Sequence, residues 1–463
     1  MTYKEPAQEI PVFGTYDVVV AGGGTAGMIA GLGAARSGAK TLVIERMGYL
    51  GGQFTGFMNT SWTCSDQIKR CVGGIAYEYF QRIEKLGGVE NPDYDRDAYI
   101  LYDSECAKYA ITDMYEKEEN LDALYLTMVT KAIMEGRKLK GVIIENKSGR
   151  QAVFAKQFID CTGDADLLEF SGSHYEELEP ENQHPASLIA KISNVDVKKL
   201  KEYYEARPEL QKGERYLGHL PHAGFYGFRL AEELEGITLP EELEYLRDWF
   251  ILFYSTPNPG EMILNMTGTT ALDGTDAAAV SRGTDMSIKR MWQVLPLFRK
   301  YVPGFEHAFI AATAPALGVR ESRKVIGGVR LTCETILNAQ KYPDAVCSYQ
   351  SPLGYHTPDG KDITFARMKP GTAYDIPLRS MVPEDVDGVI AAGRNISVES
   401  KACGSTRSMS NCMTLGHCAG VIAAWAAEND REMREIPNDT LRRILKEQDI
   451  YFAETDNETT VKE

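Results

Sequence analysis

The chain has 463 residues, of which 43% are hydrophobic, 25% charged and 10% aromatic. This length exceeds the size at which one hydrophobic core usually stops growing, so we expect two or more connected folded domains. Fifty lysines and arginines stand against 66 aspartates and glutamates, a formal net charge of -16. Such a charge disfavours nucleic acid and anionic lipid as partners.

The N-terminal segment carries acids and prolines and has no basic region followed by an apolar one, so we expect a cytoplasmic protein without a signal peptide. No apolar stretch approaches the roughly 18 to 20 residues that a membrane span needs. Nine scattered cysteines are expected to be reduced thiols. No metal site is predicted, because no cluster of His, Cys and acidic residues has ligand spacing. The sequence does not indicate an oligomeric state.

Two apolar runs, at residues 16–22 and 40–45, are typical of buried parallel strands. The intervening "GTAGMIAGLGAARSG" is typical of a helix that ends at Gly38, which completes a β-α-β unit. Three β-branched and aromatic runs between residues 123 and 161 follow. They predict a small antiparallel excursion, after which the chain re-enters the main sheet at residues 158–161.

Between residues 174 and 330 the segments become charged and amphipathic, with joints rich in Pro and Gly, which predicts an inserted α+β substrate or cap domain. An apolar strand in "DGVIAAGR" and a long helix rich in small residues then return to the first domain. The predicted fold class is α/β, with a Rossmann-like dinucleotide-binding domain built on a parallel central sheet. Its two parts are residues 1–173 and 331–436, and a C-terminal helix and tail occupy residues 437–463.

A glycine motif lies between the first strand and its helix. Gly22, Gly24 and Gly27 fit G-x-G-x-x-G, and Glu45 ends the next strand. Gly22 permits the tight turn, Gly24 lets the backbone approach a pyrophosphate, and Gly27 allows close helix packing. The helix start, with Thr25 and Ala26, offers free N–H groups to the phosphates.

Glu45 can accept hydrogen bonds from ribose hydroxyls and would repel a 2'-phosphate, so a dinucleotide site is predicted. This element alone leaves FAD and NAD open. Gly51 and Gly52 follow the second strand and allow close approach to a ligand that continues past the pyrophosphate, which favours FAD. A second G-x-G-x-x-G, typical of enzymes that also bind a pyridine nucleotide on a similar domain, is absent from the sequence.

The motifs "LGGQFTG", "IDCTGDADL", "ALGVRESRKVIGG" and "YDIPLRSMVP", with the glycine motif, carry a family resemblance. From about Tyr16 to Ala427 the chain resembles the FAD-dependent oxidoreductases that share their flavin fold with glutathione reductase and the fumarate reductase flavoprotein. The branch it resembles is common in bacterial sugar- and acid-degrading gene clusters. The resemblance implies FAD as cofactor and further contacts, at Arg46, Gly51, Gly52, Gln53, Val129 (through its backbone, to adenine), Thr162, Gly163, Asp164, Gly393 and Arg394.

The last helix is expected to begin near Ser410, Asn411 and Met413 and to aim its N-terminus at the flavin. Reduced flavin is negative at its N1 and C2 carbonyl edge, which the helix dipole would stabilise. The glycines four residues apart in this helix, Gly416 and Gly420, predict a face that presses against the sheet or the cofactor.

Three residues are candidates for the chemistry beside the flavin. His356, in "SPLGYHTPDG", is the first choice for general base or acid. Arg320 lies in a charged segment with Glu321 and Arg323 that could equally form a structural ion-pair network. Arg379 could bind a carboxylate or anchor the cofactor.

These observations predict a soluble FAD-dependent oxidoreductase. It would transfer a hydride between flavin N5 and a small organic substrate, either an alcohol, an amine or an activated alkene. The electron acceptor or donor and the direction are not indicated. An FAD-dependent monooxygenase and a non-catalytic electron-transfer flavoprotein subunit stay as alternatives.

Overall fold

The computed structural model describes residues 2–453, apart from 59–60, 66–67, 98, 208–224, 229–233, 235, 248–250, 266–267 and 362. A seven-stranded sheet lies at its centre, in the order β5-β2-β1-β8-β7-β6, with β20 paired to β8. The strands are β1 (Val12–Ala21), β2 (Thr41–Ile44), β5 (Leu121–Leu124), β6 (Met128–Glu135), β7 (Lys138–Asn146), β8 (Gly149–Asp160) and β20 (Val389–Ala391).

Five of these strands, β5, β2, β1, β8 and β20, pair in parallel. β7 pairs antiparallel with both of its neighbours, β8 and β6. Val18, Val19 and Val20 of β1 are completely buried, as expected where both faces of a sheet are covered. The predicted α/β class with a parallel central sheet is therefore confirmed.

The predicted antiparallel excursion is part of this sheet, and the chain re-enters the sheet earlier than residues 158–161, where the sequence predicted it. β8 pairs with β1 from Ala152 onward, up to Asp160. Its other edge serves two partners, β7 up to Phe154 and β20 from Phe158. One strand of 12 residues is long enough to join both partners, so no separate layer forms.

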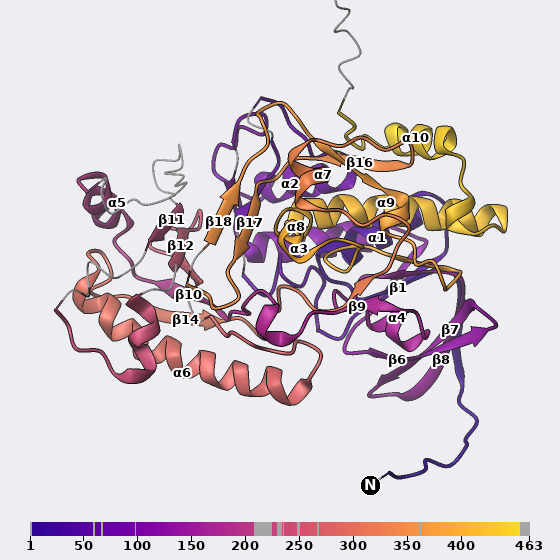
Figure 1. Cartoon of the computed structure of the whole chain (residues 1–463), viewed down its shortest axis with the longest axis horizontal. Helices are drawn as coiled ribbons and strands as arrows, with labels where there is room; N and C mark the ends of the chain where they lie inside the picture. The colour runs from indigo at the N-terminus through magenta and orange to yellow at the C-terminus, as the bar shows by residue number, and fades with distance from the viewer. Residues whose placement is uncertain are drawn as a thin grey trace, which may run out of the picture.

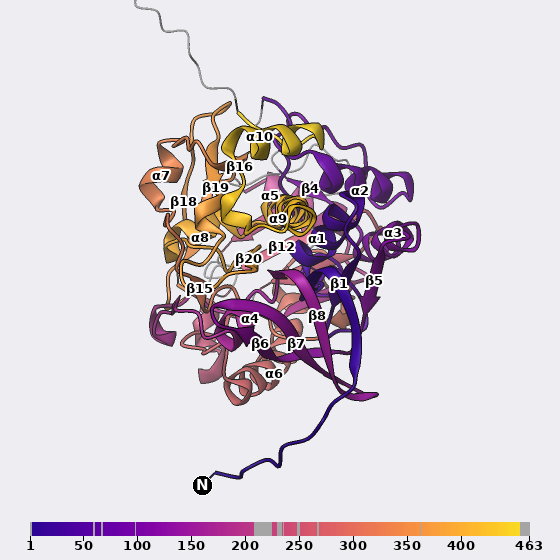
Figure 2. The same cartoon turned by 90° about the vertical axis from the view of Figure 1, so that its right-hand side faces the viewer.

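Two helices, α1 (Thr25–Arg36) and α9 (Met409–Asn429), pack side by side against the sheet, as Figure 2 shows along the axis of α9. A Cβ atom on Gly416 would overlap the carbonyl of Ala26, and one on Gly420 would overlap that of Ala30. The two glycines of α9 thus press against α1 and not against the sheet, whereas a contact of this helix face with the cofactor stays a prediction. Close helix approach is what these two glycines allow.

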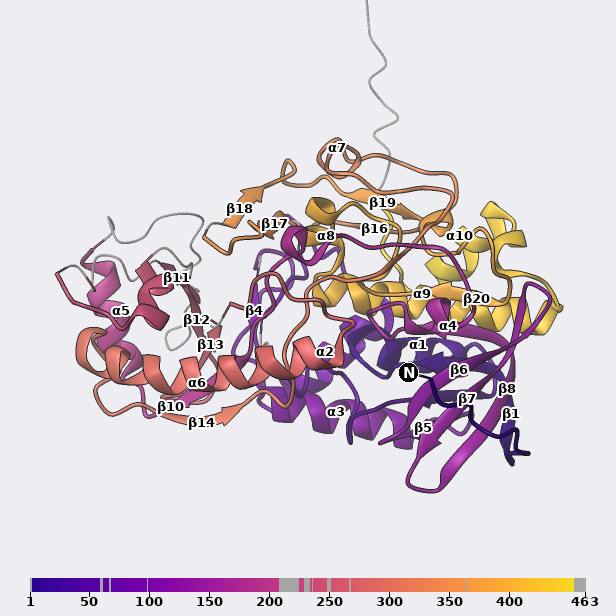
Figure 3. The same cartoon turned by 60° about the horizontal axis from the view of Figure 1, so that its bottom comes forward.

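A second, antiparallel sheet lies at the other end of the molecule (Figure 1). Its order is β11 (Phe225–Phe228), β12 (Ile251–Ser255), β13 (Met262–Asn265), β10 (Ile189–Ser193) and β14 (Phe309–Thr313). The long helix α6 (Ala277–Tyr301) runs along it, as Figure 3 shows, and Phe253, Phe298 and Phe305 form an aromatic cluster in its core. These elements fall within residues 174–330, whose boundaries as a domain stay a prediction.

The other elements surround the two sheets. They are β3 (Ser61–Trp62), β4 (Ile100–Leu101), β9 (Tyr175–Glu176), β15 (Lys324–Val325), β16 (Ala345–Tyr349), β17 (Leu353–His356), β18 (Ile363–Ala366), β19 (Tyr374–Pro377), α2 (Gly74–Lys85), α3 (Ser104–Glu116), α4 (Asp166–Phe170), α5 (Val197–Glu205), α7 (Cys333–Leu337), α8 (Ser400–Thr406) and α10 (Asn438–Glu447). Short 3-10 turns cover Pro180–Asn182, Glu241–Arg247, Leu378–Ser380 and Met433–Glu435. Within the described ranges, no helix combines the length and apolar character of a membrane span.

Candidate functional site

The glycine motif adopts the geometry expected of a phosphate-binding turn. Gly22 follows β1 with a φ of 92°, in the left-handed region that favours glycine. A Cβ on Gly27 would overlap the carbonyl of Gly22, so only glycine lets α1 start this close to the strand. A Cβ on Gly24 would meet no described atom within 4 Å, so the space over this residue is open.

The start of α1 is joined to the loop that follows β2. The hydroxyl of Thr25 donates to the Gly51 carbonyl over 3.0 Å, and the Gly51 N–H donates to the Gly23 carbonyl over 2.8 Å. A Cβ on Gly52 would lie 3.2 Å from the Gly24 Cα. The Gly51–Gln53 loop and the first turn of α1, which includes Ala26, therefore border the same open space.

Glu45 is buried at the end of β2 and bonds to the glycine motif. Its Oε2 accepts from the Gly23 N–H and its Oε1 from the Met47 N–H, both over 2.7 Å. Burial raises the pKa of Glu45, and these N–H donors oppose the shift. Arg46 next to it is exposed.

The adenine side of the predicted site is continuous with Glu45. The Thr127 N–H donates to the Glu45 carbonyl over 3.1 Å, and Val129 is the second residue of β6, which follows directly. The buried hydroxyl of Tyr49 has no hydrogen-bond partner within the described ranges. Burial and then the charge of Glu45 raise the pKa of Tyr49 to about 12, so this hydroxyl keeps its proton to donate.

The ends of β8 and β20 meet beside α1. Oδ1 of Asp164 accepts from Nη2 of Arg394 and from the hydroxyl of Ser322, each over 2.5 Å. A Cβ on Gly163 would clash with the Arg394 guanidinium, and Gly393, with a φ of 122°, faces Ala26. At the same strand end, the Thr162 hydroxyl donates to Asp160 over 2.7 Å.

The first turn of α9 carries no acidic side chain and leaves its N–H groups available. The Tyr349 hydroxyl lies 2.6 Å from the hydroxyls of Ser408 and Ser410. The side-chain amide of Asn411 donates to the Thr406 carbonyl over 2.7 Å. Met413 is completely buried one turn further on.

The residues present fit FAD. Open space lies over Gly24 where a pyrophosphate would pass, and several buried polar atoms lack a hydrogen-bond partner in the described part of the chain. Those next to the predicted cofactor contacts are Tyr49 Oη, Arg394 Nε, Thr406 Oγ1 and Asn411 Oδ1. Unpaired buried polar atoms are rare in proteins, and a bound ligand is a standard explanation for them. The ADP half would lie at the glycine motif and the flavin end at the start of α9.

His356, at the end of β17, belongs to a cluster of basic side chains with His184, which is also buried, and with Arg320 and Arg407, which are half-buried. Burial, and then the charges of Arg320 and Arg407, lower the pKa of His356 well below its ordinary value. Burial and the charge of Arg407 lower the pKa of Arg320 to about 9. His356 and Arg320 were predicted from the sequence as site residues, whereas His184 and Arg407 were not.

Arg407 could have been found, because it lies three residues before Ser410, where the start of α9 was predicted. His184 lies in a loop far away in the sequence and carries no local signal. Packing of β17 on α8 brings the segments together, since a Cβ on Gly404 would overlap the Gly354 backbone. The rings of His184 and Tyr355 lie 6.4 Å apart.

A chain of contacts joins this basic cluster to the predicted flavin loop. Nη2 of Arg320 donates to the Ser187 hydroxyl over 3.1 Å, and Ser187 and Gly318 exchange backbone hydrogen bonds. A Cβ on Gly318 would lie 3.6 Å from Oε1 of Gln53. On the other side, Arg407 adjoins Ser408, the N-cap of α9.

The acidic and basic residues that follow Arg320 form ion pairs. Glu321 accepts from Lys324 over 2.8 Å and from the Ser400 hydroxyl over 2.7 Å. Arg323 lies 2.7 Å from Asp166. These ion pairs form the structural network that was the alternative prediction for this segment. Arg320 itself is not part of them, because it donates to the Pro185 carbonyl and the Ser187 hydroxyl.

Arg379 lies apart from the basic cluster. Its side chain is 54% exposed, and its guanidinium pairs with Asp344 over 2.9 Å. Both residues line a surface pocket of about 530 Å³ with Glu384 and Arg434. Its role in catalysis or cofactor binding stays a prediction that the geometry does not strengthen.

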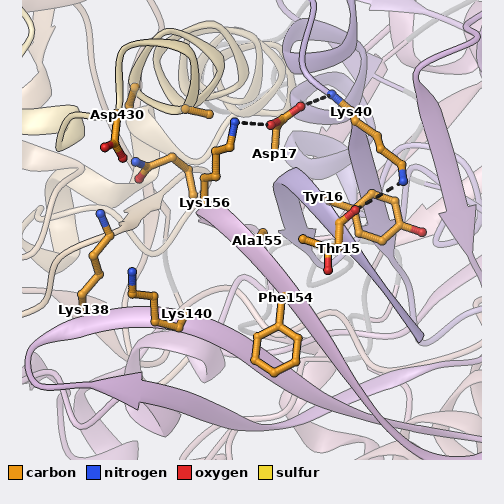
Figure 4. A pocket seen from close by; sticks show the side chains of 13 residues that line it. Thr15, Tyr16, Asp17, Lys40, Lys138, Lys140, Phe154, Ala155, Lys156 and Asp430 are labelled. Carbon is orange, nitrogen blue, oxygen red and sulfur yellow. Dashed lines mark hydrogen bonds and ion pairs between the residues drawn. The ribbon is translucent and has the colours of Figure 1, made fainter. Parts of the chain in front are cut away.

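Figure 4 shows another pocket, of about 400 Å³, whose lining contains Lys40, Lys138, Lys140 and Lys156. Lys156 pairs with Asp17 over 2.7 Å. The pocket lies along the earlier parts of β1 and β8, whereas ligands of open parallel sheets bind at the carboxyl ends of the strands. We therefore do not assign the cofactor to it.

Comparison with known proteins adds a family. A family model described as FAD dependent oxidoreductase matches residues 17–445. This range includes every predicted cofactor contact and both sheets, apart from the first five residues of β1.

Solved structures resemble the chain over most of its length. A geranylgeranyl bacteriochlorophyll reductase-like protein from Thermoplasma acidophilum is 14% identical, with 94% of this chain and 84% of that chain covered and a TM-score of 0.46. A p-nitrophenol 4-monooxygenase from Pseudomonas putida is 11% identical, with 94% of this chain and 81% of that chain covered and a TM-score of 0.42. A flavoprotein/dehydrogenase from Cytophaga hutchinsonii is 12% identical (93% and 82%, TM-score 0.44). These likenesses are distant, so the family rests on the family model.

Proposed function

Because the chain belongs to the FAD dependent oxidoreductase family, we propose that it oxidises a small alcohol or amine with FAD as its cofactor. The match over residues 17–445 confirms the resemblance found in the sequence and the assignment of FAD. When bound, FAD supplies the redox chemistry by accepting a hydride from the substrate carbon.

The protonation state of His356 is the observation that indicates the direction of the redox reaction. Its imidazole is 8% exposed, and in the part of the chain that is described its Nδ1 has no hydrogen-bond partner. The lowered pKa keeps it neutral near pH 7. A neutral imidazole has a free lone pair that can take the proton of a substrate hydroxyl or amine. Giving up its own N–H proton to saturate an alkene would leave an imidazolate, which is a much less favourable step. This favours oxidation of an alcohol or amine over reduction of an activated alkene.

The other residues of the site have supporting roles in this proposal. Arg320 orients the substrate from the side of Gln53. The N–H groups of Ser410 and Asn411, in the first turn of α9, offer partial positive charge to the reduced cofactor. We place the reaction in the cytoplasm, because all nine cysteines are present as thiols, which suits a reducing compartment.

Anaerobic reduction of the purified holoenzyme tests this proposal. Hydroxy acids, sugars and amines are mixed with the enzyme, and bleaching of the flavin absorbance is followed. At least one alcohol or amine should bleach the flavin, and His356→Ala should keep its FAD while losing at least about a hundredfold in reduction rate. His307→Ala, at an exposed position, is the matched control and should reduce at the wild-type rate.

Three outcomes would contradict the proposal. An unchanged reduction rate in His356→Ala would remove this residue from the mechanism. Rapid reoxidation by oxygen with an oxygenated product would indicate a monooxygenase. Reduction by a protein partner alone, with no small molecule active, would indicate an electron-transfer subunit.

A further inference from the structure

Within the described residues, the carboxylate beside the basic cluster of Arg320, Arg407, His184 and His356 is that of Glu321, whose Oε1 lies 3.8 Å from Nε2 of His184. Lys324 already balances the charge of Glu321, whose oxygens also accept from the Ser400 hydroxyl and the His184 backbone N–H. Nε of Arg407 is buried with no hydrogen-bond partner among the residues described. Two guanidinium groups therefore lie near each other with unused donor capacity.

Arg407 lies close enough to Arg320 for its charge to act on the Arg320 guanidinium. After burial, the charge of Arg407 is the cause that lowers the pKa of Arg320 to about 9. An anion placed between the guanidinium groups would relieve this repulsion and accept their hydrogen bonds. A neutral ligand would do neither.

Besides a negative charge, a ligand at this cluster needs a hydrogen-bond donor, as the hydrogen bonds of His184 indicate. Its Nε2 lies 3.1 Å from the Ser400 carbonyl oxygen, which can only accept, so Nε2 carries the hydrogen. The Nδ1 of the neutral ring is then an acceptor, and it has no partner in the described ranges. Burial, and then the charge of Arg407, lower the pKa of His184, which keeps the ring neutral. A ligand here must bring a hydrogen-bond donor.

We propose that the basic cluster selects a small 2-hydroxy or 2-amino acid. Its carboxylate binds between Arg320 and Arg407. Its hydroxyl donates to one of the unpaired Nδ1 atoms of His356 and His184, whereas an amino group can donate to both. This inference rests on the proposed function, because it names the substrate class of the same oxidation. The contacts from Arg320 through Ser187 and Gly318 to Gln53 put this ligand beside the flavin loop.

Calorimetric titration of the oxidised wild-type holoenzyme under anaerobic conditions tests the inference. Two matched sets of probes are used: lactate, lactamide and propionate, and mandelate, mandelamide and phenylacetate. At least one hydroxy acid should bind, and its amide and its analogue without the hydroxyl should each bind about tenfold more weakly or worse. If neither hydroxy acid binds, or if the amide binds as tightly as the acid, the inference is wrong.

Variants locate the binding site. Arg320→Gln and Arg407→Gln should each weaken binding of the hydroxy acid about tenfold or more and leave binding of the amide unchanged. Arg330→Gln is the matched control, because Arg330 is 48% exposed and pairs with Glu176. Wild-type affinity for the acid in an FAD-loaded Arg407→Gln protein would overturn the assignment. The comparison of acid with amide uses wild-type protein and stands even where a variant fails to fold.

Bleaching of the flavin, followed in the same samples, separates this inference from the proposed function. Hydroxy-acid binding without bleaching would support the anion site and contradict the oxidation. Bleaching by neutral alcohols with no preference for acids would support the oxidation and contradict the anion site.

Discussion

Nη2 of Arg394 donates a hydrogen bond to Oδ1 of Asp164 over 2.5 Å, although 230 positions separate the two residues. Arg394 follows β20 and Asp164 follows β8, and the two strands are neighbours in the sheet. The same carboxylate oxygen accepts from Ser322, which belongs to the segment that carries Arg320. The Asp164 side chain thus links the carboxyl ends of two neighbouring strands to the segment that carries Arg320.

Asp164→Ala should lower the free energy of unfolding by about 2 kcal/mol, because it leaves the Arg394 guanidinium without its charged partner. Urea unfolding of the FAD-free protein measures the loss. Glu447→Ala is the control, because Glu447 and its partner Arg443 are both 61% exposed, and it should change stability by at most about 0.5 kcal/mol. An equal effect of the two substitutions would show that the Asp164 pair is no stronger than a surface pair.

The β-α-β unit was predictable because its signals are local. Apolar runs mark β1 and β2, and a tight turn, an open approach and a close helix contact each require a glycine. The structural roles of Gly22, Gly24 and Gly27 can therefore be predicted from the sequence alone. The start of α9 was predictable in the same way, within one residue of Ser410.

What the sequence could not predict depends on contacts between distant segments. The partner of Gly416 and Gly420 is α1, and helical spacing alone does not say which surface a small-residue face meets. His184 joins His356 only because β17 packs on α8. Arg379 resembled a site residue by its neighbours in sequence, yet its pairing with Asp344 holds it at a different surface.

The two glycines of the motif should separate folding from cofactor binding. Gly27→Ala should destabilise the FAD-free protein by roughly 1 to 3 kcal/mol, since the new Cβ overlaps the Gly22 carbonyl. Gly24→Ala should leave its stability within about 1 kcal/mol, because the new Cβ enters open space. It should nevertheless weaken FAD binding at least about tenfold by occupying the pyrophosphate path. Thermal unfolding and FAD titration measure the two effects, and wild-type FAD affinity in Gly24→Ala would contradict this path.

Acidification should destabilise the protein through His417. Burial lowers the pKa of His417 to about 4, while Nε2 donates to Gln448 over 2.7 Å and Nδ1 accepts from the Ile75 N–H over 3.4 Å. The folded state therefore binds this proton more weakly than the unfolded chain. The resulting stability is present above about pH 6.5 and lost as the pH falls toward 4.

Between pH 7 and pH 5, wild type should lose about 2 kcal/mol more than His417→Gln in urea unfolding of the FAD-free protein. His307→Gln removes an exposed histidine instead and should keep the wild-type pH dependence. The same pH dependence in wild type and His417→Gln would mean that this histidine is not the titrating group.

Glu45 should be required for FAD and dispensable for the fold. Glu45→Gln keeps the size of the side chain but removes the charge and one of the two acceptors that hold the Gly23 and Met47 N–H groups. Because burial raises the pKa of Glu45, the ionised carboxylate weakens the FAD-free fold above that pKa, and the neutral amide offsets the lost acceptor. Stability should therefore stay within about 1 kcal/mol of wild type.

FAD should bind to Glu45→Gln about tenfold more weakly than to wild type, since an amide accepts less strongly from ribose hydroxyls than a carboxylate does. Fluorescence titration of the FAD-free protein measures this affinity, with Glu145→Gln, at an exposed end of β7, as control. A normal FAD affinity together with normal stability would show that the carboxylate serves only the turn between β1 and α1.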